Sequence, residues 1–219
     1  MSELISEGHN KISASQVERE RLLAAITLRI RQSLDLDSII NQTVQEVRLF
    51  LQTDRVLVYR FEPDWSGLMV AESVVTPYQA VIGSKVKDPC LTEKHIEKYK
   101  HGGIRVIENV ETARLPDCYR DLLASFEVKA NLVVPIIAEE KLWGLLIAQH
   151  CKCPRQWDSS EIELLELLAN HVGIAVQQAE LYQQVQSLNT YLERKVKNRT
   201  VKLEKAVQFE ALITRVTKS

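Results

Sequence analysis

Two apolar runs, Asn131-Leu-Val-Val-Pro-Ile-Ile-Ala138 and Leu142-Trp-Gly-Leu-Leu-Ile-Ala-Gln-His-Cys151, decide the fold of this chain. Their β-branched and aromatic residues favour strands. The charged residues Glu139-Glu140-Lys141 between them are typical of a short turn, so we expect an antiparallel hairpin. Pro135 cannot donate a hydrogen bond to a strand ladder, and it therefore marks an edge or a bulge.

A cysteine precedes this hairpin. Cys118 begins a short helical pattern, Leu115-Pro-Asp-Cys-Tyr-Arg-Asp-Leu-Leu123. A lone cysteine is more often a small buried apolar residue than a reactive group. The neighbours Asp117, Tyr119 and Arg120 are polar, and this setting favours a thiol that faces a pocket.

The other cysteines are Cys90, in a long loop bounded by Gly and Pro, and Cys151 and Cys153, which follow the second apolar run. The Cys-Lys-Cys spacing does not match a tetrahedral zinc site. The N-terminus lacks the basic start and apolar stretch of a secretory signal, so we expect a cytoplasmic protein. Disulfides are not expected in that compartment.

The composition is that of one globular domain with extensions. The chain has 219 residues, of which 45% are hydrophobic and 26% charged, and its formal net charge is −1. No apolar run is long enough to span a bilayer, and no basic cluster indicates a nucleic-acid partner. Because the sequence contains no Gly-rich phosphate loop, HExxH or GxSxG motif, we expect no enzymatic activity.

Helices are expected before the first strands. Apolar residues recur at helical spacing from Ser15 to Phe50, with a break at residues 34–37 that divides the pattern into two helices. Asp37 or Ser38 is expected to cap the second helix by accepting a hydrogen bond from its first turn.

Three further strands and a long loop follow. The segments from Arg55 to Phe61 and from Leu68 to Val75 are expected to form a second hairpin. The loop from Thr76 to Arg105 holds one helical segment, Thr92 to Tyr99, and a loop of this length is usually functional or disordered. The segment from Ile104 to Ile107 is a short strand candidate.

This order predicts an α+β fold, an antiparallel sheet with helices on one face. The long loop and the Cys118 helix would cover the other face and leave a ligand pocket beneath them. Inward side chains of Val133, Leu145 and Ile147, or of their alternates one residue along, would line that pocket.

The C-terminal part reads as one very long helix. Asp158-Ser-Ser-Glu161 has the composition of a capping box, and apolar positions continue at helical spacing to Leu203. A helix folded back on its own domain would explain the segment from Glu161 to Gln178 but not the one from Leu181 to Leu203, which predicts a coiled coil or signalling helix. We therefore expect a lead-in helix over residues 1–33, a domain over 34–182 and a coiled-coil or linker helix over 183–219.

Several motifs together resemble the bilin-binding GAF domains of cyanobacteriochromes, which are relatives of phytochromes. The resemblance covers roughly residues 34–182. The motifs that carry it are Arg55-Val-Leu-Val-Tyr-Arg-Phe61 with Asp64-Trp-Ser-Gly67 and Val70-Ala-Glu-Ser73, the segment from Tyr99 to Arg105, Cys118-Tyr119 with Val128-Lys-Ala-Asn-Leu-Val-Val-Pro-Ile136, and Leu142-Trp-Gly-Leu-Leu-Ile-Ala148 with Cys153-Pro-Arg-Gln-Trp157.

The resemblance implies a photosensory module. It would bind a linear tetrapyrrole, phycocyanobilin or phycoviolobilin, through a thioether at Cys118, and relay light-driven isomerisation through the terminal helices to an output domain beyond residue 219. The terminal helices would also pair with a second copy of the chain. Asp88-Pro-Cys90-Leu91 is similar to the Asp-Xaa-Cys-Phe motif of the dual-cysteine subgroup, in which Cys90 would form a second, reversible thioether and Asp88 would meet the pyrrole nitrogens.

The same resemblance implies further bilin contacts. Tyr119 stands where the family usually has a histidine that packs on the chromophore, and Tyr99 belongs to the same pocket. Arg105 matches a propionate-binding arginine, whose planar guanidinium forms paired bonds to a carboxylate. Lys129 stands where many members have Arg. In the last strand, either Gln149 or His150 would reach the D ring.

Plainer alternatives remain beside these roles. Arg105 could be a solvated surface residue, and Asp88 could only cap the turn at Pro89. The domain could also lack a chromophore and serve as a GAF module for small-ligand binding, such as a cyclic nucleotide, or for dimerisation. A third alternative is an enzyme of the free methionine sulfoxide reductase type, in which Cys90 and Cys118 would be the attacking and resolving thiols.

Overall fold

A computed structural model describes residues 17, 20–28, 30, 33, 35–88 and 90–216, with side chains described as far as residue 203. Leu34, expected to begin the domain, and Pro89 lie outside the described residues. So does most of the lead-in segment 1–33, of which residues 17, 20–28 and 30 are helical. The chain divides between Gln177 and Gln178 into two compact units.

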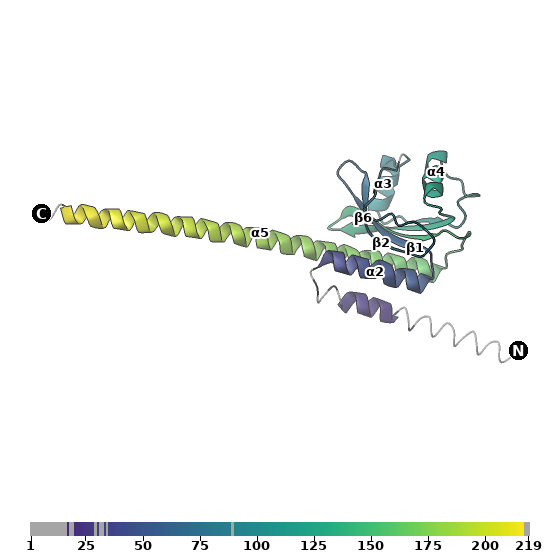
Figure 1. Ribbon diagram of the computed structural model, residues 1–219, viewed down its shortest axis with the longest axis horizontal. Helices are drawn as coiled ribbons and strands as arrows, with labels where there is room; N and C mark the ends of the chain where they lie inside the picture. Colours follow the sequence, from purple (N-terminus) through teal and green to yellow (C-terminus); the bar gives the residue numbers. More distant parts are fainter. Residues whose placement is uncertain are drawn as a thin grey trace. The chain divides into compact units, whose positions relative to one another are not determined.

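The first unit is built on a six-stranded antiparallel sheet in the order β3-β2-β1-β6-β5-β4 (Figure 1). Both expected hairpins, β1 with β2 and β5 with β6, are confirmed. The strands are β1 Arg55–Phe61, β2 Gly67–Val74, β3 Lys85–Val86, β4 Arg105–Ile107, β5 Ala130–Ala138 and β6 Lys141–His150. The helices are α2 Leu36–Leu51, α3 Glu93–Lys100, α4 Asp117–Ser125 and α5 Ser159–Val216.

The sheet lies between two layers, as the α+β prediction requires. In Figure 1, α2 and the first part of α5 cover one face, while α3 and α4 lie over the other. Leu132, Val134, Leu146 and Ala148 belong to the core on the α2 and α5 side. Their neighbours along β5 and β6 face the opposite side, because successive side chains of a strand alternate between its faces.

Helix α2 packs on the sheet through the stripe expected from its sequence. Ile39, Val44 and Val47 are among its buried residues. The prediction that Asp37 or Ser38 caps this helix is wrong. Asp35 is the cap, because its backbone is extended and its carboxylate accepts a hydrogen bond from the Ser38 N–H at 3.3 Å.

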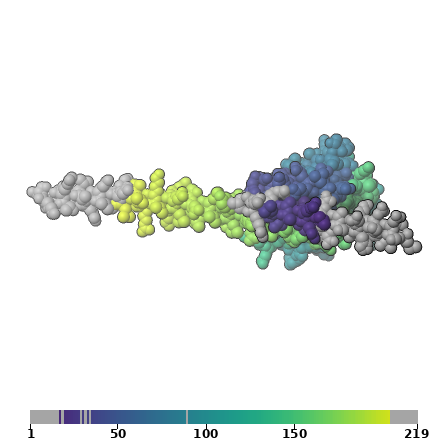
Figure 2. Space-filling view, turned by 90° about the horizontal axis from the view of Figure 1, so that it is seen from below, coloured from purple at the N-terminus to yellow at the C-terminus, as the bar shows by residue number. Residues whose placement is uncertain are grey.

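The described residues of the lead-in segment add a layer to this core. Ile26 and Ile30 are buried in it, and Leu22 and Leu23 pack against it from partly exposed positions. Figure 2 looks onto this side of the first unit, where the purple side chains of residues 20–28 and 35–50 cover much of the visible surface. The first helical pattern therefore contributes to the domain's core as well as leading into it.

Pro135 lies where β5 has a neighbouring strand on one side only. Strand β4 pairs with Asn131, Leu132 and Val133, and it does not extend to Pro135. The expectation of an edge at Pro135 is therefore confirmed, because a residue without an N–H is tolerated where no partner strand needs that donor. The β5–β6 register shifts just beyond it, between Ile136 and Ile137.

Helix α5 has 58 residues and continues from the first unit into the second. It begins after Asp158, whose N–H donates to the Glu161 carboxylate at 3.0 Å, one half of the expected capping box. Among its residues with described side chains, up to Leu203, the last buried one is Val176, and Leu181, Leu188 and Leu192 are 46%, 57% and 46% exposed. Among the described residues, no helix has the length and apolar character needed to cross a membrane.

Candidate functional site

A cavity lies on the sheet face beneath α3 and α4. The space free of protein atoms, including the part open to solvent, is about 610 Å³. Val133, Leu145 and Ile147 line it as predicted, rather than their alternates one residue along. The other apolar and aromatic lining residues are Tyr59, Phe61, Met69, Val86, Leu91, Leu122, Leu123 and Phe126.

Four residues expected to contact a ligand supply the remaining lining: Asp88, Tyr99, Arg105 and Tyr119. Arg105 is partly buried, and its guanidinium carbon lies 4.2 Å from the centre of the Tyr119 ring. Burial raises the pKa of both tyrosines, and the positive charge of Arg105 opposes the rise. Both hydroxyls therefore stay protonated near neutral pH, next to a fixed positive charge.

Tyr119 is further fixed by the sheet below it. The Asn131 side-chain amide, which is buried, donates to the Tyr119 hydroxyl at 3.3 Å. Tyr119 itself lies in the first turn of α4, one residue after Cys118. Its ring therefore ties the N-terminal turn of that helix to the cavity.

Asp88 both lines the cavity and shapes the turn that carries Cys90. Its carboxylate accepts a hydrogen bond from the Cys90 N–H at 2.8 Å, and its carbonyl accepts one from the Leu91 N–H at 3.2 Å. The expected alternative, that Asp88 caps this turn, is therefore compatible with a place in the cavity wall. One residue thus belongs to both the cavity wall and the cysteine loop.

Tyr59 anchors the start of this loop. Its hydroxyl donates to the Val86 carbonyl at 3.0 Å, two residues before Asp88. The Tyr59 ring lies directly over Gly67, where an added Cβ would collide with it. Burial, with smaller effects from Asp88 and Asp64, raises the pKa of Tyr59 to about 12, so the hydroxyl remains a donor.

Cys90 and Cys118 meet beside the cavity. Their Cα atoms are 6.1 Å apart, and the two residues are joined as a disulfide. The expectation that the chain holds no disulfide is therefore wrong for this pair. The loop after β3 and the first turn of α4 bring together two cysteines that are 28 residues apart in sequence. Both the dual-cysteine resemblance and the reductase alternative required these two residues to lie close together.

Three other predicted contacts are outside the cavity lining. Lys129 is 41% exposed and pairs with Glu111 at 2.8 Å. Gln149 is on the same strand face as Ile147, but its amide oxygen accepts a hydrogen bond from Arg55. His150 is on the opposite face of β6.

On that face, the His150 ring pairs with the carboxylate of Asp54, just before β1. The His150 Nδ1 lies 3.3 Å from an oxygen of Asp54, and the same oxygen accepts the Cys151 N–H at 2.7 Å. Of the two candidates in the last strand, Gln149 is thus the one turned toward the cavity face.

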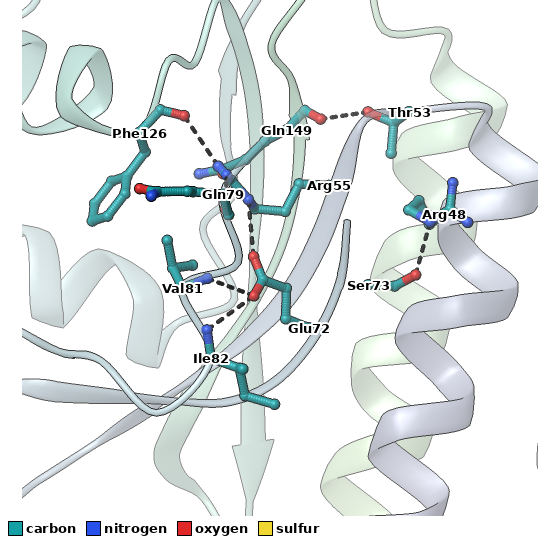
Figure 3. Close-up of polar contacts among 10 residues, drawn as sticks. All are labelled: Arg48, Thr53, Arg55, Glu72, Ser73, Gln79, Val81, Ile82, Phe126 and Gln149. Carbon is teal, nitrogen blue, oxygen red and sulfur yellow. Dashed lines mark hydrogen bonds and ion pairs between the residues drawn. The ribbon is translucent and has the colours of Figure 1, made fainter. Parts of the chain in front are cut away.

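A buried polar cluster closes the region next to the cavity (Figure 3). The Arg55 side chain is 1% exposed and forms an ion pair with Glu72 at 3.0 Å. Its guanidinium also donates to the Gln149 amide oxygen at 3.0 Å and to the carbonyls of Phe126 and Gln79 at 3.1 and 2.8 Å. Phe126 lines the cavity, so this cluster links the cavity wall to the centre of the sheet.

Glu72 extends the cluster into the loop after β2. Its carboxylate accepts the N–H groups of Val81 and Ile82 at 2.7 and 2.9 Å. The cluster is not among the residues predicted from the sequence. One signal could have found it: Arg55 and Glu72 are opposite charges at diagonal positions of the predicted β1–β2 hairpin, close enough for long side chains to meet.

Comparison with known proteins now assigns the family. The sequence profile of the GAF domain matches residues 35–176. The chain belongs to the GAF domain family. Its GAF domain is similar in structure to bilin-binding GAF domains, as the resemblance in its sequence predicted.

Two solved structures illustrate this similarity. The GAF domain of PixJ from Thermosynechococcus elongatus, in its blue-light absorbing form, is 34% identical with a TM-score of 0.67, covering 71% of this chain and 94% of that one. A phycocyanobilin-bound GAF domain from a cyanobacterial phytochrome is 32% identical with a TM-score of 0.70, covering 75% of this chain and 96% of that one.

Curated relatives are much longer than this chain. A putative methyl-accepting chemotaxis protein of Synechocystis sp. is 38% identical over 181 residues, which is 83% of this chain and 18% of the relative. The chain spans at most 28% of the length of the four relatives it matches first. These alignments therefore describe a module within larger proteins.

The Arg55 cluster leads to a test of stability. Replacing Arg55 by Ala should lower the free energy of unfolding by about 3–5 kcal/mol, because it leaves the Glu72 carboxylate buried without its cation. Urea denaturation followed by circular dichroism measures this loss. The control is Arg60→Ala on the same strand, whose pair with Glu62 is 41% and 31% exposed and should contribute less than about 1 kcal/mol. Equal losses in the two variants would contradict a structural role for the cluster.

Proposed function

We propose that this chain is a photosensory GAF module that binds a linear tetrapyrrole covalently through Cys118. The observation that carries the proposal is the placement of Cys118 in the first turn of α4, immediately before Tyr119, a cavity-lining residue. The similarity to GAF domains that hold biliverdin and phycocyanobilin supports the same ligand class. Phycocyanobilin or phycoviolobilin is the form proposed for this chain.

The cavity's residues fit such a ligand. Its floor of aliphatic and aromatic side chains suits the faces of flat pyrrole rings, which are largely apolar. Arg105, with the Tyr99 and Tyr119 hydroxyls beside it, is a cluster of donors for a propionate carboxylate. Asp88 offers an acceptor for pyrrole N–H groups.

Lys129, Gln149 and His150 are not part of this proposed contact set. Each is held by another side chain, Glu111, Arg55 and Asp54 respectively. A direct role for any of them would require that these pairs break. Gln149 faces the cavity side, and it would affect the ligand only indirectly. The Arg55 guanidinium that bonds to its amide oxygen also holds the carbonyl of Phe126, a cavity-lining residue.

Cys118 is suited to the attachment step in the reduced protein. The first N–H groups of a helix have no helical acceptor and carry partial positive charge, which stabilises a thiolate in the first turn. The tetrapyrrole supplies a conjugated system that absorbs light and a side-chain double bond to which a thiol can add. In that addition the sulfur bonds to one carbon and the thiol proton ends on its neighbour, so no oxidant is consumed.

Substitution of Cys118 tests the attachment. The Cys118→Ala protein, made in cells that synthesise phycocyanobilin, should fold but carry no covalent pigment. Zinc-enhanced fluorescence on a denaturing gel measures the label. Cys153→Ala, at an exposed free cysteine, is the control and should label like the parent. A fluorescent Cys118→Ala band would overturn the assignment, and a colourless parent would favour a chromophore-free GAF module.

Cys90 is proposed to form a second, reversible thioether to the same pigment. It is carried by the turn that Asp88 caps, next to Cys118, and its neighbours Asp88 and Leu91 line the cavity. A thioether at the central bridge would divide the conjugated system into two shorter parts, which absorb at higher energy. The proposal therefore assigns a violet-to-blue state to the two-thioether form.

The absorption spectrum of Cys90→Ala tests this second linkage. The variant should keep its covalent pigment at Cys118 but lose the short-wavelength state both before and after illumination. The parent protein, measured under reducing conditions, is the reference. A violet-to-blue band that persists in Cys90→Ala, or that never appears in the parent, would make Cys90 a bystander.

The second unit is proposed to connect the GAF domain to an output domain and to a second copy of the chain. Exposed apolar residues at steps of three and four, Leu181, Val185, Leu188 and Leu192, form a stripe typical of a coiled-coil seam. A stripe of this kind is stabilised when it meets the same stripe of a partner helix. Parallel pairing would carry a change in α5 toward whatever domain follows it.

Charge substitutions on the stripe test the dimer. Replacing Leu181, Leu188 and Leu192 together by Lys should convert a dimer to a monomer, since the charges would be buried in the seam. Analytical ultracentrifugation measures the mass. The matched control places three Lys on the opposite side of the helix, at the exposed positions 183, 186 and 190. A parent monomer, or an unchanged dimer in the apolar-stripe variant, would contradict the proposal.

A further inference from the structure

Two cysteines from separate elements are held together in this domain. Cys90 follows the two-residue strand β3, and Cys118 is the second residue of α4. Their Cα separation of 6.1 Å lies inside the range of about 4.4–6.8 Å found for protein disulfides. The bond between them therefore needs no movement of either backbone.

Each cysteine is fixed by its own contacts. The Cys90 N–H is held by the Asp88 carboxylate, and the strand before it by the Tyr59 hydroxyl. The turn that begins α4 is held by Arg120, which bonds to Asp117 at 3.0 Å and to the carbonyls of Ala113 and Leu115. When one of two thiols placed in this way has formed a mixed disulfide with a small molecule, the other attacks it at a high effective concentration, because little chain entropy is left to lose.

We propose that Cys90 and Cys118 form a redox-active pair whose disulfide blocks chromophore attachment, so that only the reduced apoprotein can be loaded. The pairing itself stands on the geometry above. Its consequence for loading rests on the proposed function of Cys118. The pair would respond to small-molecule disulfides of the glutathione or lipoate class.

The oxidation balances without another reactant. The Cys118 thiolate attacks one sulfur of the small disulfide, forms a mixed disulfide and expels the other sulfur as a thiolate. The Cys90 thiolate then attacks the protein sulfur of the mixed disulfide and releases the second small thiol. Two protein thiols become one disulfide, and the small disulfide is reduced to two thiols by the same pair of electrons.

The disulfide and the thioether exclude each other. While the Cys118 sulfur is bonded to Cys90, it is not a thiolate and cannot add to a carbon–carbon double bond. Conversely, a loaded Cys118 is a thioether and cannot be oxidised by a disulfide, so Cys90 is left without its partner. The redox state of the cell would therefore act on the apoprotein, before loading, and not on the mature photoreceptor.

The remaining described cysteines offer no equivalent pair. Cys151 is buried, and this burial raises the pKa of its thiol to about 11, which keeps it protonated and slow to exchange. Cys153 is exposed, and it follows Cys151 by two residues in sequence. Both serve as internal references for the reactivity of Cys90 and Cys118.

The test oxidises the purified apoprotein with excess lipoic acid, a cyclic disulfide, and compares it with protein kept in dithiothreitol. Thiols are counted by alkylation and mass spectrometry. Phycocyanobilin is then added, and covalent label is read by zinc fluorescence on a non-reducing denaturing gel. A lone thiol that attacks a cyclic disulfide is expelled again by the second sulfur, so single cysteines are not trapped.

The expected result is a loss of two alkylatable thiols, a linked Cys90–Cys118 peptide and at least a tenfold drop in labelling, all reversed by dithiothreitol. Cys90→Ser should label equally in both conditions, whereas Cys153→Ser should behave as the parent. Full alkylation of the treated parent would overturn the pair, and equal labelling despite the linked peptide would overturn the block. A linked peptide with no labelling of the reduced protein would overturn the function proposed for Cys118 and leave the redox pair standing.

Discussion

Strict alternation of side chains along β5 and β6 is the constraint on which this domain depends. Leu146 and Ala148 enter the core under α2 and α5, while Leu145 and Ile147 line the cavity. A shift of one residue would exchange the two sets, because the side-chain period of a strand is two. Both sets are apolar, so composition alone does not say which set enters the core and which lines the cavity. Helices α2 and α5 decide this by packing on one face of the sheet.

The strands and helices were predictable because each is decided by local composition. β-branched runs give β1, β5 and β6, and helical spacing gives α2 and α5. Strand β3 was not predictable, since two residues are too few to show an alternation and its pairing depends on β2. The cap of α2 was misplaced for a related reason: the chain offers acidic residues at 35 and 37, and only the backbone conformation selects between them.

The candidate site was predictable in part. Asp88, Tyr99, Arg105 and Tyr119 line the cavity as the family resemblance implied. The approach of Cys90 to Cys118 was implied by the same resemblance, whereas the cluster around Arg55 depends on contacts between segments far apart in sequence. Gln149 was expected to contact the ligand because of its place in the β6 motif. Its amide oxygen instead accepts a hydrogen bond from Arg55, and no pattern within β6 reveals this bond.

Asp88 joins the cavity to the pair of cysteines through one carboxylate. The oxygen that accepts the Cys90 N–H belongs to a residue that also lines the cavity. A ligand donor that drew this carboxylate inward would weaken the bond to Cys90, while Tyr59 would still hold the strand before it at Val86. The loop would then loosen at Cys90 but not at its base. Occupation of the cavity would in this way be coupled to the position of Cys90 over a few residues.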